Sequence, residues 1–226
     1  MPTHQPRPKL AAILTAQPVP CRQRPADATG YPSQADSQRA QNRQIWSFGT
    51  LANDLGTGTP SRQGAYERLA PQKCSRQAQS DPQDVAVVVL DSAVKGITPA
   101  RLPKAGSLSN LSVGTRFTAV GYGAQSVTID QGPTFHYADI RYVATGGLNA
   151  LNPSWLRLSM NPARGDGGTC YGDSGGPNFL GAGTGETNIV AATTITGDFM
   201  CRATNVDYRM DTASARAFPG QYVTLP

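Results

Sequence analysis

The sequence contains very little histidine, with only His4 and His136 among its 226 residues. Cysteine is also scarce, at four residues, and both residue types are too scattered to form the clusters of nitrogen and sulfur ligands that a zinc site needs. We therefore expect no metal and no other cofactor. A run of about 18 apolar residues is missing as well, so we expect no membrane-spanning helix and no membrane partner.

Long amphipathic helix patterns are also missing, whereas glycine and proline are abundant, at 24 and 18 residues. The apolar runs are short, rich in Val, Ile and Thr, and bounded by turn residues, as is typical of β-strands. We predict strands over residues 85–90, 117–120, 189–196 and 222–225. The pattern predicts an all-β protein, built as one large domain or as two small β-barrels.

Acidic residues are scarce near the N-terminus. Residues 1–83 hold 10 Lys/Arg and 5 Asp/Glu, whereas residues 84–226 hold 10 of each, so the net charge of +5 comes from the first segment. That segment also has 12 of the 15 glutamines. A basic composition rich in Gln and Pro is typical of poorly ordered chain. It has no arginine-rich run and no regular aromatic interleaving, so we expect no nucleic-acid partner.

One serine stands in a run of glycines: residues 168–177 read Gly-Thr-Cys-Tyr-Gly-Asp-Ser-Gly-Gly-Pro, in which the serine is Ser174. Flanking glycines allow turn conformations that can expose a hydroxyl and aim neighbouring N–H groups at one point. A nucleophile beside an oxyanion site needs this geometry. The run also satisfies the Gly-x-Ser-x-Gly pattern of α/β-hydrolases, but those enzymes need a helix directly after the serine and a later histidine. Gly175-Gly-Pro177 opposes a helix, and no histidine follows Ser174.

The run from Cys170 to Pro177 closely resembles the nucleophile loop of chymotrypsin/trypsin-like serine proteases of the extracellular, bacterial type. Residues 84–91, Asp-Val-Ala-Val-Val-Val-Leu-Asp, resemble the strand that carries the buried aspartate of this family. Residues 97–103 resemble the segment after that strand, and residues 120–123, Val-Gly-Tyr-Gly, resemble the turn that opens the second barrel. The resemblance extends from about Asp84 to the C-terminus and is poor before it.

The resemblance implies a chymotrypsin-like fold of two six-stranded antiparallel Greek-key β-barrels. The N-terminal barrel would span residues 1–112 and be incomplete, with residues 1–50 matching poorly, and the C-terminal barrel would span residues 113–226. It implies a serine-type endopeptidase that hydrolyses peptide bonds through an acyl-enzyme on Ser174. Asp84 would orient the general base, and the N–H groups of Gly172 and Ser174 would form the oxyanion hole.

The same resemblance implies a disulfide between Cys170 and Cys201, whereas Cys21 and Cys74 match no pair in the family and either pair with each other or stay free. It also places the specificity pocket, whose predicted residues are Gly168, Tyr171, Thr194 and Thr196. Gly168 stands where an enzyme selective for Arg or Lys would have an aspartate, and Asp166 lies two residues away. We therefore predict that the pocket takes an uncharged side chain.

The family resemblance also implies a monomer with protein or peptide substrates and an extracellular location. The cysteines agree, because disulfides persist in oxidising compartments. The signal for secretion is weak. The apolar run at residues 10–16 has the minimum length for the core of a signal peptide, and the same residues partly match the family's histidine segment.

A general base is missing from the expected place. The family has a histidine upstream of its aspartate, in a segment that Ile13-Leu-Thr-Ala16 partly matches, but Gln17 and Pro18 follow here and neither is a base. His136 lies in the alternating run 134–142, which predicts a strand of the second barrel remote from the catalytic cleft. We predict that His4, in a Pro-rich segment, is a poorly ordered residue.

A second departure concerns Asp173. In the family, the aspartate at this position pairs with a chain-terminal amine released by cleavage, but no Ile-Val-Gly-Gly-like segment precedes it here. The sequence therefore predicts a buried carboxylate without a partner, which is costly. Three explanations fit these departures: an upstream sequence mistranslated through a wrong start or a shifted reading frame, a catalytically inactive homologue that binds proteins or peptides, or an active enzyme with another base.

Overall fold

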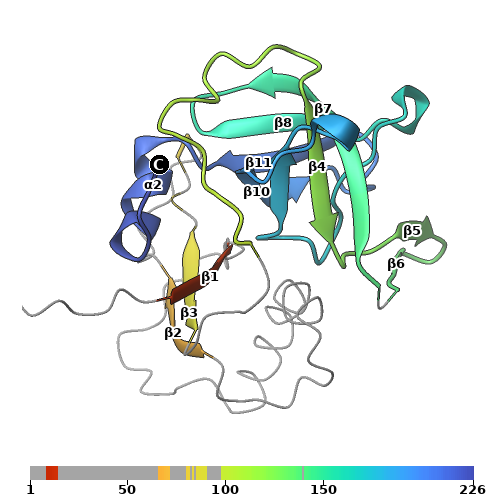
Figure 1. Cartoon of the computed structure of the whole chain (residues 1–226). Helices are drawn as coiled ribbons and strands as arrows, with labels where there is room; N and C mark the ends of the chain where they lie inside the picture. Colours follow the sequence, from red (N-terminus) through yellow and green to blue (C-terminus); the bar gives the residue numbers. More distant parts are fainter. Residues whose placement is uncertain are drawn as a thin grey trace, which may run out of the picture.

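The computed structural model describes residues 9–14, 66–71, 80–81, 83, 85–90, 98–138 and 140–226. β-strands are the main regular secondary structure of the described chain (Figure 1). Six strands form a closed antiparallel barrel in the order β10-β11-β8-β7-β4-β9. They are β4 (Arg116–Gly121), β7 (Tyr142–Leu151), β8 (Trp155–Ser159), β9 (Pro177–Leu180), β10 (Val190–Gly197) and β11 (Thr204–Arg209). The prediction of an all-β protein with a six-stranded antiparallel barrel is confirmed.

Three further strands form a separate antiparallel sheet in the order β1-β3-β2. They are β1 (Lys9–Leu14), β2 (Tyr66–Pro71) and β3 (Ala86–Leu90). These strands lie within residues 1–112, where the first barrel is expected, and both that barrel and the boundary between residues 112 and 113 stay predictions. The strand predicted at residues 85–90 corresponds to β3, and those predicted at 117–120 and 189–196 correspond to β4 and β10.

The barrel interior is filled by seven buried apolar side chains from its strands and from the segment that precedes β4. They are Leu108, Phe117, Leu148, Leu156, Leu158, Ala191 and Ala192. Burying a side chain of the size of Leu or Phe stabilises a fold by about 1.5–3 kcal/mol. This core gives β9 and β10, which flank the glycine-rich loop, a stable support.

A second apolar cluster joins the chain around β3 to the barrel. Val85 is 2% exposed and belongs to one buried cluster with Ile195 of β10 and Tyr208 of β11. The hydroxyl of Tyr208 donates a hydrogen bond to Oδ1 of Asp81 at 2.8 Å. Asp81 and Val85, which precede β3, are therefore held against β10 and β11.

The predicted C-terminal strand at residues 222–225 is wrong. The chain after β11 forms the short helix α2 (Ala213–Ala217) and a 3-10 turn, η3 (Pro219–Gln221). The Tyr222 N–H donates to the carbonyl of Pro219 at 2.9 Å, and the Tyr222 ring packs against Phe218 with centroids 5.4 Å apart. The apolar residues of this run therefore serve helical packing rather than pairing in a sheet.

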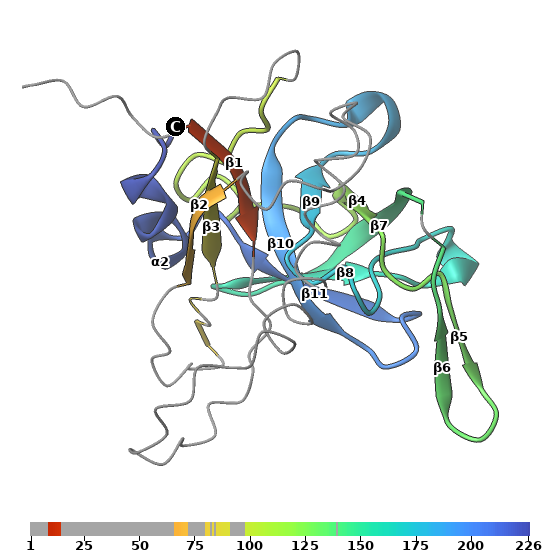
Figure 2. The same ribbon diagram turned by 90° about the horizontal axis from the view of Figure 1, so that it is seen from below.

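The alternating run at residues 134–142 is not one barrel strand either. It contains the end of a hairpin made of β5 (Ser126–Ile129) and β6 (Pro133–His136), and β7 of the barrel begins at Tyr142. The hairpin is a two-stranded sheet of its own and projects from the barrel (Figure 2). Period-two alternation suits both strands, so the pattern does not show where one strand ends and the next begins.

Candidate functional site

Ser174 lies in the loop that leads into β9, and two glycines give this loop its shape. Gly172 has φ of 102° and Gly175 has φ of 82°, a left-handed conformation that favours glycine. The Gly175 N–H donates to the carbonyl of Thr194 at 2.8 Å, and the Thr194 N–H donates to the carbonyl of Gly176 at 3.0 Å. The loop is thereby attached to β10 at Gly175 and Gly176, directly after Ser174.

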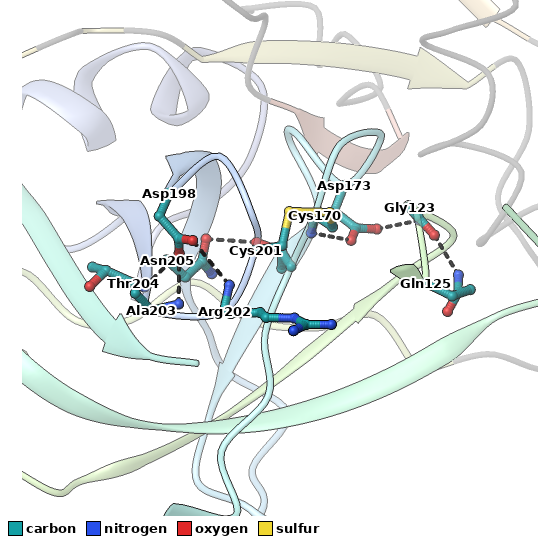
Figure 3. The surroundings of a disulfide bond; sticks show 11 residues. Gly123, Gln125, Cys170, Asp173, Asp198, Cys201, Arg202, Ala203, Thr204 and Asn205 are labelled. Carbon is teal, nitrogen blue, oxygen red and sulfur yellow. Dashed lines mark hydrogen bonds between the residues drawn. A yellow bond between two sulfur atoms is a disulfide. The ribbon is translucent and has the colours of Figure 1, made fainter. Parts of the chain in front are cut away.

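The predicted disulfide between Cys170 and Cys201 is confirmed. It joins the loop that carries Ser174 to the turn between β10 and β11 (Figure 3). Cys21 and Cys74 lie outside the described residues. Because the bridge connects two segments that are 31 residues apart, it limits how far the two sides of the loop can separate.

Asp173 has partners, contrary to the prediction of an unpaired carboxylate. Its Oδ1 accepts a hydrogen bond from the Gly123 N–H at 2.7 Å, and its Oδ2 accepts one from the Cys170 N–H at 2.9 Å. Figure 3 shows the carboxylate between these two residues. Backbone amides thus satisfy a group for which the sequence indicated no cation.

The space around Asp173 also depends on glycine. A Cβ atom at Gly121 or at Gly123 would overlap the Asp173 carboxylate. Burial raises the pKa of Asp173 above the ordinary aspartate value, and hydrogen bonds from the backbone of Cys170, Gly123 and Tyr122 oppose that rise. The carboxylate therefore packs directly against the chain that leaves β4.

A small cavity of about 70 Å³ opens beside Ser174. Of the predicted pocket residues, Tyr171, Thr194 and Thr196 line this cavity together with Ser174. Its remaining lining residues are Thr169, Cys170, Ile195, Gly197, Asp198 and Cys201. Hydroxyl and apolar groups dominate the wall of this cavity.

Gly168, the fourth predicted pocket residue, lines a different cavity, which it shares with Asp173. A Cβ atom at Gly168 would overlap the side chain of Met160, which is buried. The neighbouring Asp166 is paired with Arg116 and lies 3.8 Å from Nε of Arg164. The Asp166 carboxylate is therefore engaged in ion pairs, and it is not among the residues that line the Ser174 cavity.

Asp198 also lines the Ser174 cavity, and its carboxylate binds the backbone of the turn between β10 and β11. It accepts hydrogen bonds from the N–H groups of Arg202, Ala203 and Thr204 at 3.1, 2.8 and 2.9 Å. Burial alone would raise the pKa of Asp198, but these donors outweigh it and hold the pKa below the ordinary value. Asp198 closes the turn that carries Cys201 (Figure 3).

A buried polar network lies behind β10, and the sequence did not indicate it. Asp207 of β11 is fully buried, and its Oδ1 accepts a hydrogen bond from Nδ2 of Asn178 at 2.9 Å. Nδ2 of Asn178 also lies 3.0 Å from Oγ1 of Thr194, which lines the Ser174 cavity. Burial raises the pKa of Asp207 well above the ordinary value. Alternation along β11 was the available signal, but it does not distinguish a polar residue in a buried network from one in solvent.

Asp84, the predicted orienting aspartate, lies outside the described residues. Its neighbour Val85 packs in the same cluster as Ile195, and Ile195 lines the Ser174 cavity. Val85 therefore lies close to the wall of that cavity. The role of Asp84 stays a prediction.

His136 is not on a remote strand, contrary to the prediction. Phe135, which directly precedes His136 in β6, packs against Tyr171 in a tilted contact with ring centroids 4.3 Å apart. Strand β6 therefore lies beside the Ser174 loop. The His136 side chain, however, is exposed, and its Nε2 lies 2.9 Å from Oγ1 of Thr128. Because adjacent strand residues point to opposite faces, His136 faces away from Tyr171. His4 lies outside the described residues.

Within the described part of the chain, no group of three or more His, Cys, Asp or Glu side chains is arranged to hold a metal ion. Among the same residues, no helix has the length and apolar character needed to cross a membrane.

Comparisons with known proteins agree with this architecture. One solved structure, a mutant of human heparin binding protein, is 16% identical, with 74% of this chain and 71% of that chain aligned and a TM-score of 0.50. Human heparin binding protein itself is 16% identical, with a TM-score of 0.49, and the alignment covers 70% of this chain but only 65% of that chain. No curated protein sequence matches the chain. The family model described as Trypsin matches residues 33–214, and the chain therefore belongs to the trypsin family of serine proteases.

Proposed function

We propose that this protein is a serine-type endopeptidase that hydrolyses peptide bonds through an acyl-enzyme on Ser174. In this proposal the Ser174 hydroxyl attacks the substrate carbonyl, and the N–H groups of Gly172 and Ser174 stabilise the oxyanion that forms. One such donor typically contributes about 2.7–4 kcal/mol to transition-state stabilisation. Asp84 would orient the group that accepts the Ser174 proton.

The observation that carries the proposal is the bracing of the Ser174 loop. The Cys170–Cys201 disulfide, the Asp173 carboxylate and the backbone pairing with Thr194 hold the loop from three directions. Electrostatic catalysis depends on donors that are oriented before the reaction begins, because donors that must reorganise lose much of their effect. A loop braced in this way meets that requirement.

The cavity supports a polypeptide substrate with a small uncharged side chain. Thr194, Ile195 and Thr196 offer hydroxyl and apolar surface, and Asp198 is engaged with backbone amides. A lysine or arginine side chain would find no available carboxylate among the residues that line the cavity. We therefore propose that the cavity does not select substrates with lysine or arginine side chains. This proposed preference for uncharged side chains does not depend on whether Gly168 forms the floor of the pocket.

We also propose a two-barrel organisation, with residues 1–112 and 113–226 as its halves and Asp84 contributed by the first. We further propose an extracellular location, because a disulfide beside the active serine persists only where the environment is oxidising.

A second candidate is a homologue that binds polypeptides without cutting them. The observation that favours it is the orientation of His136, whose side chain faces away from the Ser174 loop. Without a general base, catalysis falls by about 10⁴–10⁶-fold. The cavity and the braced loop would persist as a binding surface.

Labelling with a fluorophosphonate separates the two candidates, because this reagent reacts with serines whose hydroxyl is activated. For the endopeptidase we expect stoichiometric labelling that Ser174→Ala abolishes and His136→Ala leaves unchanged. Circular dichroism establishes that each variant is folded. A folded native chain that does not label, and does not cleave a mixture of Thr- and Ala-rich peptides that it binds, would establish the second candidate instead.

A further inference from the structure

Three aromatic rings from separate segments meet beside the Ser174 cavity. Phe135 comes from β6, Tyr171 from the Ser174 loop, and Phe199 from the turn between β10 and β11. The Phe135 and Tyr171 ring centroids are 4.3 Å apart, and Phe199 lies 6.3 Å from each of the other two in edge-on geometry. We call these three residues the aromatic cluster.

The aromatic cluster lies at the surface although its rings are large and apolar. Tyr171 is 40% exposed and Phe199 is 49% exposed, and Tyr137, next along the hairpin, is 60% exposed. Single exposed apolar residues are common on soluble proteins, but contiguous apolar patches mark surfaces that bind another molecule. Phe135 reaches this patch from the hairpin β5–β6, because its ring packs against Tyr171.

The three chain segments that carry the aromatic cluster are held in place by a disulfide and by hydrogen bonds. The Cys170–Cys201 disulfide ties the segment of Tyr171 to that of Phe199, and the Asp198 carboxylate closes the turn. The hairpin is joined to the Ser174 loop by the Ala124 N–H, which donates to the carbonyl of Tyr171 at 2.9 Å. A surface that is already ordered loses little conformational entropy when it binds a partner.

The aromatic cluster is continuous with the proposed active site. Tyr171 belongs to the aromatic cluster and also lines the cavity beside Ser174. The Tyr137 ring also lies close to the Ser174 loop: a Cβ atom added at Gly172 would be 3.5 Å from Cε1 of Tyr137. A polypeptide whose carbonyl reaches Ser174 therefore runs past these rings.

We propose that the aromatic cluster is a second side-chain subsite, which selects an apolar aromatic residue of the polypeptide that occupies the Ser174 cavity. This inference rests on the proposed function in one respect, namely that polypeptides bind at Ser174. Aromatic rings favour other rings in tilted or edge-on contacts, the geometry that the three residues already show among themselves. Phe135 and Phe199 are then specificity-determining residues, although neither belongs to the glycine-rich motif.

The test measures peptide binding to the full chain with Ser174→Ala, so that hydrolysis does not interfere. A fluorescein-labelled hexapeptide of Thr and Ala carries a single Phe, which is moved through all six positions, and fluorescence anisotropy gives the affinity. We expect one position at which Phe strengthens binding by about tenfold relative to Ala, equivalent to about 1.4 kcal/mol. Phe135→Ala and Phe199→Ala should each remove most of this gain.

Ile129→Ala is the matched control, because Ile129 is an exposed apolar residue of the same hairpin outside the aromatic cluster. It should leave the gain from Phe unchanged, and circular dichroism checks the fold of every variant. Peptides that bind equally well with Phe at any position would overturn the subsite and leave the proposed function standing. If Lys strengthened peptide binding as much as Phe at the same position, the aromatic cluster would bind cations and the proposed aromatic preference would be wrong.

Two further outcomes also count against the subsite. A folded chain that binds none of the peptides would contradict the proposed function together with the inference. Dimerisation in analytical ultracentrifugation that Phe199→Ala abolishes would show instead that a second copy of the chain covers the aromatic cluster.

Discussion

The Asp173 carboxylate accepts a hydrogen bond from the Gly123 N–H at 2.7 Å, across 50 residues of sequence. This contact joins the loop that carries Ser174 to the chain that leaves β4, and it provides a partner for a carboxylate that the sequence left unpaired. Because the donor is a backbone amide, the contact does not depend on a cleaved chain terminus. The loop is therefore held by groups that are present as soon as the barrel has formed.

Gly123→Ala should disrupt this contact, because the added methyl group would overlap the Asp173 carboxylate. Overpacking of this kind destabilises a protein by about 1–3 kcal/mol. Urea unfolding followed by fluorescence measures the loss. Gly185→Ala is the matched control, since no atom lies near its added methyl group and its backbone φ is not in the left-handed region. Equal stability of the two variants would contradict the close packing around Asp173.

Asp207→Asn should change how stability depends on pH. Burial raises the pKa of Asp207 in the folded protein above its value in the unfolded chain, so the folded state binds the proton more tightly. The stability contributed by this group is therefore greatest at low pH and is lost as pH rises from the unfolded pKa of 3.8 through the raised folded pKa. Asparagine resembles the protonated acid and removes this loss.

Within that pH window, the stability of Asp207→Asn relative to the native protein should increase by up to about 1.4 kcal/mol per pH unit. Urea unfolding at a series of pH values measures the difference, in which other titrating groups such as Asp173 largely cancel. A difference that stays constant from mildly acidic to neutral pH would show that Asp207 does not titrate above its ordinary range.

Replacing Cys170 and Cys201 together by Ala should destabilise the fold. The bridge closes a loop of 31 residues, for which the chain-entropy model gives about 3.5 kcal/mol. Thermal unfolding compares the double variant with the native protein, each with and without reductant. Reductant should lower the midpoint of the native protein toward that of the variant. A native midpoint that reductant does not move would argue against a stabilising role of the bridge.

Tyr208→Phe should weaken the attachment of the segment before β3 to the barrel. Its hydroxyl donates to Asp81 and lies 3.3 Å from Oγ of Ser214, and burial is the main cause that raises the pKa of Tyr208 to about 12. Loss of one such hydrogen bond costs about 0.5–1.5 kcal/mol. Limited proteolysis should then cut this segment faster. Tyr222→Phe, near the C-terminus, serves as the control. If both variants had the same effect on proteolysis, the Tyr208 hydroxyl would not specifically attach the segment before β3 to the barrel.

Much of the barrel and of the candidate site was predictable from the sequence, because its signals are local. Short apolar runs rich in Val, Ile and Thr between turn residues predicted β4 and β10, and the glycines around Ser174 predicted a sharply bent loop. The disulfide followed from the family resemblance at Cys170 and Cys201. The short apolar run failed as a strand signal at residues 222–225, and alternation failed at the β6–β7 boundary, because packing partners determine which structure the chain adopts there.

The amino-acid order alone was enough to identify the family and the glycine-rich motif around Ser174, the predicted nucleophile, since glycine and turn chemistry act within a few residues. Folding in three dimensions determined the partner of Asp173, the direction of the His136 side chain, the meeting of Phe135 with Tyr171 and Phe199, and the overlap that excludes a side chain at Gly168. Each of these depends on contacts between segments that are far apart in the chain. Such contacts leave no local pattern, because they exist only once the barrel has closed and its loops have packed against one another.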